Sequence, residues 1–318
     1  MNIAWTVFLP IIAFLIGIFF LGLSRKIMAR IQWRYGPPIT QPIIDIIRAF
    51  SQRSVSHGIL FNLGIALSVA GSVAVVLFLP FGKVCPLSSS GGLLVILYLM
   101  LLSPLGFALS GGEAANPNIS IGISRKFILA LGYEVPMLLI LLSLMTYHKT
   151  ISIVKIVEAQ QNTGWSIVTL PLVLSGIAYL LILPAILGVR PFEIAGASQE
   201  ISSGPMAEYG GQYLAIADVE HALSLFIGIA LFVNLFLGGA GDIFAPVENF
   251  LASSGLSCMV TFLEGLVFFV KMLAVFVICV FINAVYPRLR IEQAIGYLWR
   301  WPTIFAFAGL VIVLIVGR

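Results

Sequence analysis

The sequence predicts an all-α, polytopic membrane protein with eight transmembrane helices. Of the 318 residues, 60% are hydrophobic and only 9% are charged, and the mean hydropathy is +1.10. Soluble domains are typically about 45–50% apolar and about 25% charged, so a large part of this surface must face lipid. The apolar runs are also long and continuous, whereas the strands of membrane barrels are shorter and alternate between apolar and polar residues.

Eight windows contain the roughly 20 apolar residues that a spanning helix needs. They lie near residues 3–23, 59–80, 93–110, 127–147, 168–188, 221–239, 262–283 and 301–316. The sequence has no internal repeat and no linker long enough to separate domains. We therefore expect residues 1–318 to form a single membrane domain.

The basic residues predict the orientation of these helices in the cell membrane. Loops one, three, five and seven together hold twelve of them: Arg25, Lys26, Arg30, Arg34, Arg48, Arg53, Arg125, Lys126, Arg190, Arg288, Arg290 and Arg300. The opposite side holds four: Lys83, Lys149, Lys155 and Arg318. Because positively charged loops are retained in the cytoplasm, we expect the odd-numbered loops there and both termini outside. The formal net charge of +4 then reflects topology and does not indicate nucleic-acid binding.

Loop one (24–58) contains a predicted amphipathic helix near residues 41–52. Its apolar residues recur at i, i+3, i+4 and i+7: Ile43, Ile46, Ile47 and Phe50. The polar residues Asp45, Arg48 and Gln52 fall elsewhere around the helix. This pattern is typical of a helix that lies in the cytoplasmic interface of the membrane.

A long acidic cytoplasmic loop between the fifth and sixth spans, covering residues 190–218, is the strongest functional signal. It carries four acidic residues in a chain that otherwise avoids charge: Glu193, Glu200, Glu208 and Asp218. Several glycines and Pro205 interrupt the segment, which predicts short helices joined by turns. Glu193 and Glu200 are seven residues apart, so on a helix they would lie within about 20° of one face.

Two interpretations of this segment are open. One is a solvated acidic loop. The other is a partly buried acidic cavity, because apolar residues such as Ile194 and Tyr209 are interleaved with the acids. In such a cavity, desolvation and neighbouring like charges raise the pKa values of carboxyl groups towards neutrality. Those groups would then exchange protons at physiological pH.

Glu134 lies inside the fourth predicted span, where a lone carboxylate is costly unless it is neutral, paired or hydrated. Pro136 also frees the backbone carbonyl of Gly132, which adds polarity to this part of the helix. Arg125 is nine residues earlier and points to the opposite side of a straight helix. We expect a partner from another helix, with Lys271 and the loop-five acids as candidates. A proton-relay role and a hydrogen-bonded structural role are both open.

Glu264 and Lys271 lie seven residues apart in the seventh predicted span. On a helix they share a face but are separated by about 10 Å along the axis, too far for direct contact. They would suit the lining of one hydrated path. A structural tie of each residue to another helix is an equally good interpretation.

His221 stands beside Asp218 and Glu220 at the start of the sixth predicted span, and imidazole titrates near neutral pH. A proton role is one interpretation, whereas a single histidine without convergent partners is weak evidence for a metal. Three scattered cysteines form no C-x-x-C pair, so we expect no iron–sulfur cluster or zinc in this chain. The sequence also lacks nucleotide-binding loops and a nucleophile elbow, so we expect no catalysis by this chain alone.

Four ordered motifs resemble a known family over nearly the whole chain. They are Ser24-Arg25-Lys26 with Arg34-Tyr35-Gly36-Pro37-Pro38, Gln41-Pro42 and Asp45; Arg125 with Glu134; Arg190-Pro191-Phe192-Glu193 with Glu200 and Glu208-Tyr209-Gly210-Gly211; and Tyr286-Pro287-Arg288-Leu289-Arg290-Ile291-Glu292-Gln293. Together they resemble the eight-span membrane anchor shared by respiratory complex I, where it is the H-type subunit, and group 4 membrane-bound NiFe-hydrogenases.

The chain departs from the complex I pattern at several positions. Residues 186–190 read Ile-Leu-Gly-Val-Arg where complex I members have an acidic residue followed by Thr-Asn-Arg, and Pro38 replaces the usual Asn. Glu193 replaces the usual Asp, and the acid-plus-Tyr pair of the sixth span is displaced to Glu220-His221. These departures resemble the ferredoxin-linked hydrogenase branch and its sulfur-reducing relatives, which use no quinone.

The resemblance implies a membrane anchor and coupling subunit of an oxidoreductase complex that links ferredoxin oxidation to proton or sodium translocation. It implies partners that carry the cofactors, namely an iron–sulfur small subunit and a NiFe-hydrogenase-like large subunit, and it also implies antiporter-like membrane subunits. It implies a relay in which Glu193, Glu200 and Glu208 pass the effect of ferredoxin oxidation to Glu134. The position of the other ionisable residues adds Asp218, Glu220, His221, Glu264 and Lys271 as candidates for this relay. It implies docking of the peripheral arm at Arg25, Lys26, Arg30, Arg34, Asp45, Arg125, Arg190, Arg288 and Arg290.

Two other functions fit the sequence. The first is the quinone-site-forming subunit of an NADH:quinone oxidoreductase, which would bind a quinone analogue near loop one and Arg190. The second is a stand-alone ion-coupled secondary transporter. Such transporters often contain inverted repeats, and the sequence has none that we detect.

Overall fold

The computed structural model describes residues 3–55, 58–82, 84–87, 92–113, 116–201, 204–207, 209–241 and 257–316. Within these ranges the chain is built from helices, and its extended pairing is limited to a single β-bridge between Phe81 and Val84. The predicted all-α class is confirmed.

Seven helical segments among the described residues are long and apolar enough to cross a membrane. They are α1 (Ile3–Ile31), α3 (Ile59–Phe78), the consecutive pair α4 (Gly92–Met100) and α5 (Leu102–Gly112), α6 (Pro117–His148), α10 (Gly211–Phe236), α12 (Ser257–Val285) and α13 (Ile291–Val316). The window predicted at 168–188 contains a shorter apolar helix, α8 (Val173–Ile186). Its 14 residues extend about 21 Å, less than the roughly 30 Å of a bilayer core. The chain is a multi-pass membrane protein, and the count of eight spans stays a prediction.

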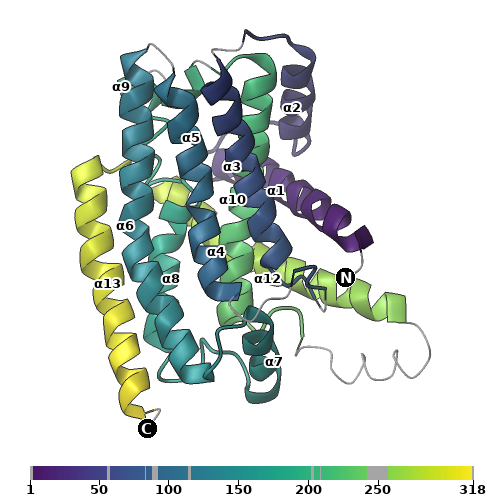
Figure 1. Cartoon of the computed structure of the whole chain (residues 1–318), viewed down its shortest axis with the longest axis vertical. Coiled ribbons are helices and arrows are strands. Elements are labelled where there is room, and N and C mark those ends of the chain that lie inside the picture. The colour runs from purple at the N-terminus through teal and green to yellow at the C-terminus, as the bar shows by residue number, and fades with distance from the viewer. Residues whose placement is uncertain are drawn as a thin grey trace.

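The predicted amphipathic helix forms as α2 (Gln41–Ser51). One side of α2 buries Ile46 and Ala49 in a cluster with residues of α1 and α10. Its remaining apolar residues, including Ile47 and Phe50, are exposed. A second short amphipathic helix, α7 (Ile153–Thr163), lies at the opposite end of the bundle (Figure 1).

Helix α10 is the central element of the bundle. It packs against α1, α2, α3, α7, α8 and α12, whereas α13 covers α6 and α8 on one flank (Figure 1). Most of its residues from Ala222 to Phe236 are buried on every side, as expected for a helix that is apolar around its whole circumference. A polar residue on α10 therefore needs a partner from a neighbouring helix.

Helices α3 and α5 approach each other closely through two glycines. A Cβ atom added to Gly64 would lie 2.4 Å from the backbone nitrogen of Ser110, and one added to Gly106 would lie 2.5 Å from the carbonyl oxygen of Gly64. Small residues allow such contact between membrane helices. The close approach places the serines of α3 beside those of α5.

Three helices begin about ten residues earlier than the sequence predicted, at Pro117, Gly211 and Ile291 rather than near residues 127, 221 and 301. Arg125 and Lys126 therefore lie on α6, and Arg300 lies on α13, instead of in loops. The Asn116 side chain accepts a hydrogen bond from the backbone nitrogen of Asn118 and Pro117 takes the first helical position, so the cap fixes the start of α6. Windows based on hydropathy end at the first charged residues, although these continue the helix.

Candidate functional site

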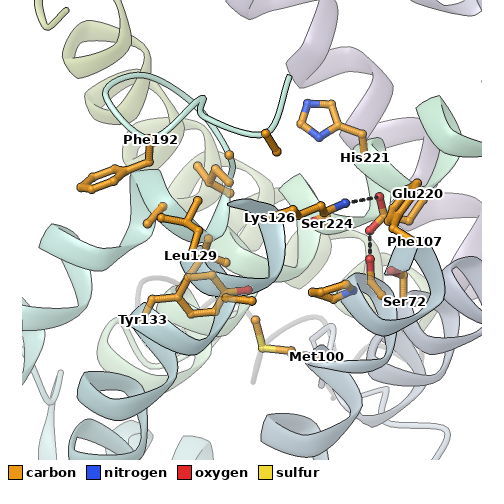
Figure 2. A pocket seen from close by; sticks show the side chains of 18 of the residues that line it. Ser72, Met100, Phe107, Lys126, Leu129, Tyr133, Phe192, Glu220, His221 and Ser224 are labelled. Atoms are coloured by element: carbon orange, nitrogen blue, oxygen red, sulfur yellow. Dashed lines mark hydrogen bonds and ion pairs between the residues drawn. The ribbon is translucent and has the colours of Figure 1, made fainter. Parts of the chain in front are cut away.

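A cavity of about 180 Å³ lies between α3, α5, α6 and α10, beneath the segment that follows α8 (Figure 2). Apolar side chains form most of its wall, and polar groups converge on it from four helices: Ser72, Ser103, Lys126, Tyr133, Glu220, His221 and Ser224. A water needs roughly 10–15 Å³ by this kind of measure together with two to four polar partners. The cavity has the room and the chemistry to hold several waters.

Glu220 of α10 is the central acid of this cavity, and only 4% of the residue is exposed. The hydroxyl of Ser103 on α5 donates a short hydrogen bond to its Oε1 atom. The Nζ atom of Lys126 on α6 lies 3.9 Å from its Oε2 atom. This distance exceeds that of a hydrogen bond, so the ion pair is loose. The Glu220 carboxylate is therefore buried with one short hydrogen bond and one cation beyond hydrogen-bond distance.

The Lys126 side chain contacts the Phe107 ring, faces Glu220 and lines the cavity. Its Nζ atom lies 3.5 Å from the centroid of the Phe107 ring, which is a close cation–π contact. The same atom faces Glu220, and the side chain lines the cavity with 31% of its surface exposed. In the sequence Lys126 stands out only as a topological charge, so its place in the site was missed.

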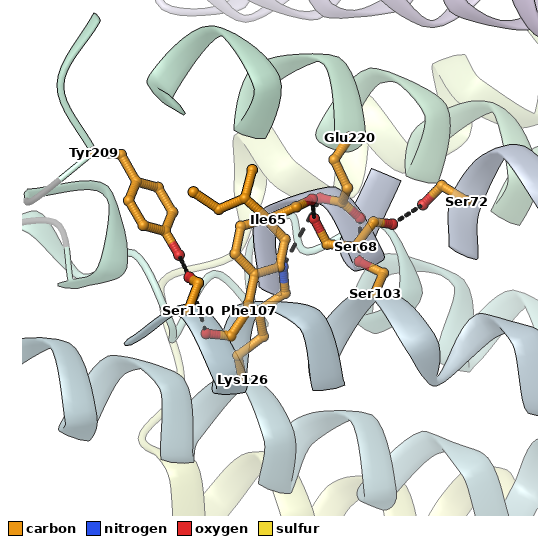
Figure 3. Close-up of polar contacts among 9 residues, drawn as sticks. All are labelled: Ile65, Ser68, Ser72, Ser103, Phe107, Ser110, Lys126, Tyr209 and Glu220. Atoms are coloured by element: carbon orange, nitrogen blue, oxygen red, sulfur yellow. Dashed lines mark hydrogen bonds and ion pairs between the residues drawn. The ribbon is translucent and has the colours of Figure 1, made fainter. Parts of the chain in front are cut away.

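Further serine hydroxyls and one tyrosine lie near Glu220 and make hydrogen bonds of their own (Figure 3). On α3, Ser72 donates to the Ser68 carbonyl at 3.3 Å, and Ser68 donates to the Ile65 carbonyl at 2.8 Å. On α5, Ser110 shares a short hydrogen bond with the hydroxyl of Tyr209, which lies in the loop before α10. Burial raises the pKa of Tyr209, the hydrogen bond from Ser110 lowers it, and the charge of Glu220 raises it further. Tyr209 therefore senses the charge of Glu220.

The serines could have been found from their spacing. Ser68 and Ser72 are four residues apart, and Ser103 and Ser110 are seven apart, so each pair lies on one face of its helix. Serine lowers the hydropathy of a span only slightly, so apolar windows do not reveal it.

The acidic loop is more closely paired with arginine than the sequence predicted. Glu193 lies 3.1 Å from Arg190 and 3.8 Å from Arg288, and it lines the cavity. Glu200 accepts a 2.8 Å hydrogen bond from Arg125, and its side chain is 54% exposed. Arg125 holds the pKa of Glu200 below its ordinary value. The prediction of raised pKa values is therefore wrong for Glu200.

The short helices α9 (Ser198–Ile201) and η1 (Gly204–Ala207) confirm the prediction of helical turns in this loop. Glu193 precedes α9 and Glu200 lies on it, so the two acids do not share a helix face. Glycines and the turn at 195–196 prevent one continuous helix from forming between them. Glu208 lies outside the described residues.

Asp218 and Glu220 belong to different surroundings. They are two residues apart on α10, about 200° around the helix, so they point in opposite directions. Asp218 interacts electrostatically with Arg25 and Asp45, which form a 3.1 Å ion pair between α1 and α2. His221 lines the cavity next to Glu220.

The remaining predicted docking residues are dispersed over the end of the bundle that also carries the Arg25–Asp45 pair. Lys26 and Arg30 lie in the last turns of α1, with Arg30 5.1 Å from the Tyr35 ring centroid. Arg34 is exposed just after this helix. Arg290 precedes α13, where its backbone nitrogen donates to the Gln293 side chain.

Lys271 and Glu264 are buried on α12, and neither residue lines the cavity of Glu220. Lys271 donates to the carbonyl oxygens of Leu237, Gly239 and Gly241 at 2.7, 2.8 and 3.4 Å, so it binds the end of α10. It is therefore not the partner predicted for Glu134, and a shared hydrated path for Lys271 and Glu264 stays a prediction.

Glu134 is half-buried on α6, next to the cavity-lining Tyr133. Within the described part of the chain, no ion pair includes Glu134. Its neighbour Tyr133 experiences the charges of both Glu134 and Glu220. Tyr133 thus places Glu134 within electrostatic reach of the cavity.

The helices and the buried network define a multi-pass membrane subunit in which ionisable groups are held between spanning helices, an arrangement that membrane proteins reserve for function. The family model described as NADH dehydrogenase matches residues 3–314, and the chain belongs to this family. Within the family it is an H-type subunit of the kind found in complex I and group 4 hydrogenases.

Individual relatives represent several branches of this family. Hydrogenase-4 component C of Escherichia coli is 32% identical over 256 residues, which are 79% of each chain. The H-type subunit of the NADH-quinone oxidoreductase of Phocaeicola vulgatus is 25% identical over 315 residues, or 95% of this chain and 86% of that protein. A chain in the structure of the membrane-bound sulfane sulfur reductase, an archaeal respiratory membrane complex, superposes with a TM-score of 0.87 at 37% identity, covering 97% of this chain and 98% of that chain.

Proposed function

We propose that this chain is the membrane anchor and coupling subunit of a multi-subunit respiratory complex in the cell membrane. The complex would link ferredoxin oxidation in a peripheral, hydrogenase-like arm to proton or sodium translocation. The observation that carries this proposal is the Glu220–Lys126–Ser103 network, in a cavity directly beneath an arginine-paired loop. The higher identity to the sulfane sulfur reductase chain and to the hydrogenase component supports this branch over the quinone branch.

The peripheral arm would dock on the basic end of the bundle, which faces the cytoplasm with both termini outside. An iron–sulfur small subunit and a NiFe-hydrogenase-like large subunit would carry the cofactors, and antiporter-like subunits would continue the membrane arm. The exposed positive charge of Arg290 and the partly exposed Arg190–Glu193 pair offer this arm an electrostatic surface.

The relay would begin at Glu193, because this residue touches both the docking arginines and the cavity. A change of charge in the docked arm would shift Glu193 and the cavity waters. Lys126 stabilises the ionised form of Glu220 while the two are close. If Lys126 moved away from Glu220 into the cavity, the buried charge would need a proton to compensate it.

From Glu220 the relay would pass through cavity waters and Tyr133 to Glu134. Ser103 keeps the Glu220 carboxylate oriented towards the cavity during this exchange. Proton transfer requires only hydrogen-bonded contacts, so serine and tyrosine hydroxyls with intervening waters are sufficient. Asp218, Glu264 and Lys271 lie outside this route.

The test is coupled transport in inverted membrane vesicles that contain the assembled complex. We expect Glu220→Gln and Glu134→Gln to reduce ferredoxin-driven ion uptake by about tenfold or more, because each removes a proton-exchanging group. Electron transfer to the acceptor should persist, and so should the complex on native gels. The matched control is Glu158→Gln, an exposed position on α7 at the opposite end of the bundle. Normal uptake in both relay variants would eliminate this route.

A quinone-binding function is the second candidate, and the 25% identical quinone oxidoreductase subunit favours it. A photoactivatable quinone analogue should then label loop one and the segment around Arg190, which the hydrogenase proposal does not predict. Co-purification separates the candidates further. A large subunit with four metal-binding cysteines indicates a hydrogenase, and ion transport by the purified single chain would indicate a stand-alone transporter.

A further inference from the structure

A second cavity, of about 310 Å³, lies between α1, α10 and α12 and is closed by residues 187–193. Helix α1 contributes one face to it through Leu21, Ser24, Arg25 and Met28. Helix α12 contributes a matching face through Phe276, Cys279, Val280 and Asn283. Both sets follow the i, i+3, i+4, i+7 spacing, so the cavity is a continuous cleft between two helices.

The lining changes from apolar to polar along the cleft. Leu21, Leu225 and Phe276 line its membrane-side end. Arg25 lies one turn further along α1, about 6 Å from Leu21, and Arg34 follows beyond the end of that helix. The cavity is therefore amphipathic, with its polar end on the side where the loops are basic.

The polar end carries excess positive charge. Arg25 is paired with Asp45, and Arg190 is paired with Glu193. Arg34 makes no ion pair with any residue that the structure describes. The guanidinium group is planar and offers several donors at once, a geometry that suits phosphate oxygens.

The apolar end of the cleft is next to lipid. Helices α1 and α12 lie at the edge of the bundle, and both expose large apolar side chains such as Leu15 and Phe281 (Figure 1). Phe20 of α1 stacks on Phe276 and Phe269 of α12, so an acyl chain leaving the cleft would pass beside this aromatic contact and enter the bilayer without crossing polar surface.

We propose that this cleft binds an anionic phospholipid, with its phosphate at Arg34 and Arg25 and its acyl chains directed between α1 and α12. The volume is at the lower end of the range for small-molecule sites, so it accommodates the headgroup and the first acyl carbons. Glu193 and His221 line both cavities. The bound phosphate would thus lie beside the Glu220 network, although lipid binding does not depend on the proposed relay.

The test uses photoactivatable phosphatidylglycerol and phosphatidylcholine in membranes that contain the intact complex, with labelled peptides identified by mass spectrometry. We expect phosphatidylglycerol to label α1 and α12 more strongly than phosphatidylcholine. Arg34→Gln should reduce this labelling about fivefold, since one basic residue near a membrane surface contributes roughly that factor. Arg48→Gln, which removes an exposed arginine of α2 outside the cleft, should leave it unchanged.

A steric variant provides a second measurement. Leu21→Trp should fill the cleft and abolish labelling, whereas Leu15→Trp, on an exposed position of the same helix, should not. Equal labelling by the two lipids, or no effect of Arg34→Gln, would overturn the proposal. Displacement by inorganic phosphate would identify a free-anion site instead, and displacement by a short-chain quinone would identify a quinone site.

Discussion

Two buried charges lie at helix α10, one in its first half and one just beyond its C-terminal end, and they are held in opposite ways. Glu220 of α10 faces a cavity and has one short hydrogen bond and a cation 3.9 Å away. Lys271 of α12 donates to the backbone carbonyls of Leu237, Gly239 and Gly241, which follow the end of α10, at 2.7–3.4 Å. It lines neither the cavity of Glu220 nor the cleft between α1 and α12.

We propose that this difference separates a structural charge from a functional one. The carbonyls at the end of a helix carry partial negative charge, and an ammonium group has three donors to satisfy them. Gln160 holds the same end of α10, donating to the carbonyls of Asn234 and Leu235 at 3.0 and 3.1 Å. Glu220 is not fixed in this way, because the Lys126 ammonium that faces it also contacts Phe107 and the cavity. Of two buried charges, the loosely held one is the better candidate for proton exchange.

Lys271→Met should produce the largest change in stability, because it removes the hydrogen-bond donors of three buried carbonyls. Methionine keeps the apolar stem of the side chain, so packing is preserved. We expect a loss of about 3 kcal/mol in the stability of the folded complex, measured by thermal unfolding in detergent. Lys155→Met, at an exposed position on α7, is the matched control. If Lys271→Met were as stable as the parent but lost coupled transport, the assignment of structural and functional ends would have to be reversed.

Ser103→Ala should have a smaller effect at the other end of α10. It removes the hydrogen bond to the Glu220 carboxylate, and bonds to charged groups contribute about 2 kcal/mol. Coupled transport should fall less than in Glu220→Gln, because the carboxylate itself remains. Ser120→Ala removes an exposed hydroxyl of α6 and serves as the control. Unchanged stability together with unchanged transport would show that Ser103 does not orient Glu220.

Much of the fold follows from the sequence because hydropathy alone determines where most of the spanning helices lie. Long apolar runs predict the spanning helices, and the spacing of Ile43, Ile46, Ile47 and Phe50 predicts α2. The start of α6 was placed too late, because Arg125 and Lys126 are polar but remain helical behind the Asn116 cap. Hydropathy measures where lipid contact ends, which differs from where a helix begins.

The site was less predictable, because its partners come from helices that are distant in sequence. Glu220 was identified as an acid at a span boundary, but Ser103 and Lys126 lie 117 and 94 positions earlier. Their convergence depends on how α5, α6 and α10 are arranged around the cavity. The charge pattern likewise revealed the loop-five acids but not the arginines that neutralise them. Pairing between distant elements is a property of the tertiary structure alone.

Glu200→Gln should give the smallest effect, because its pair with Arg125 is exposed and screened by solvent. Arg125 lowers the pKa of Glu200 below its ordinary value of 4.5. The pair should therefore stabilise the α9 region fully above the ordinary pKa, and lose this effect as the pH falls through the lower folded-state pKa. We would measure the hydrogen-exchange protection of Ser198–Ile201 as a function of pH. Protection should fall with falling pH in the parent and change less with pH in Glu200→Gln, and Glu158→Gln is the control. Identical profiles would mean that the exposed pair of Glu200 with Arg125 does not stabilise the α9 region, and the contrast between surface pairing and buried charge would lose its surface example.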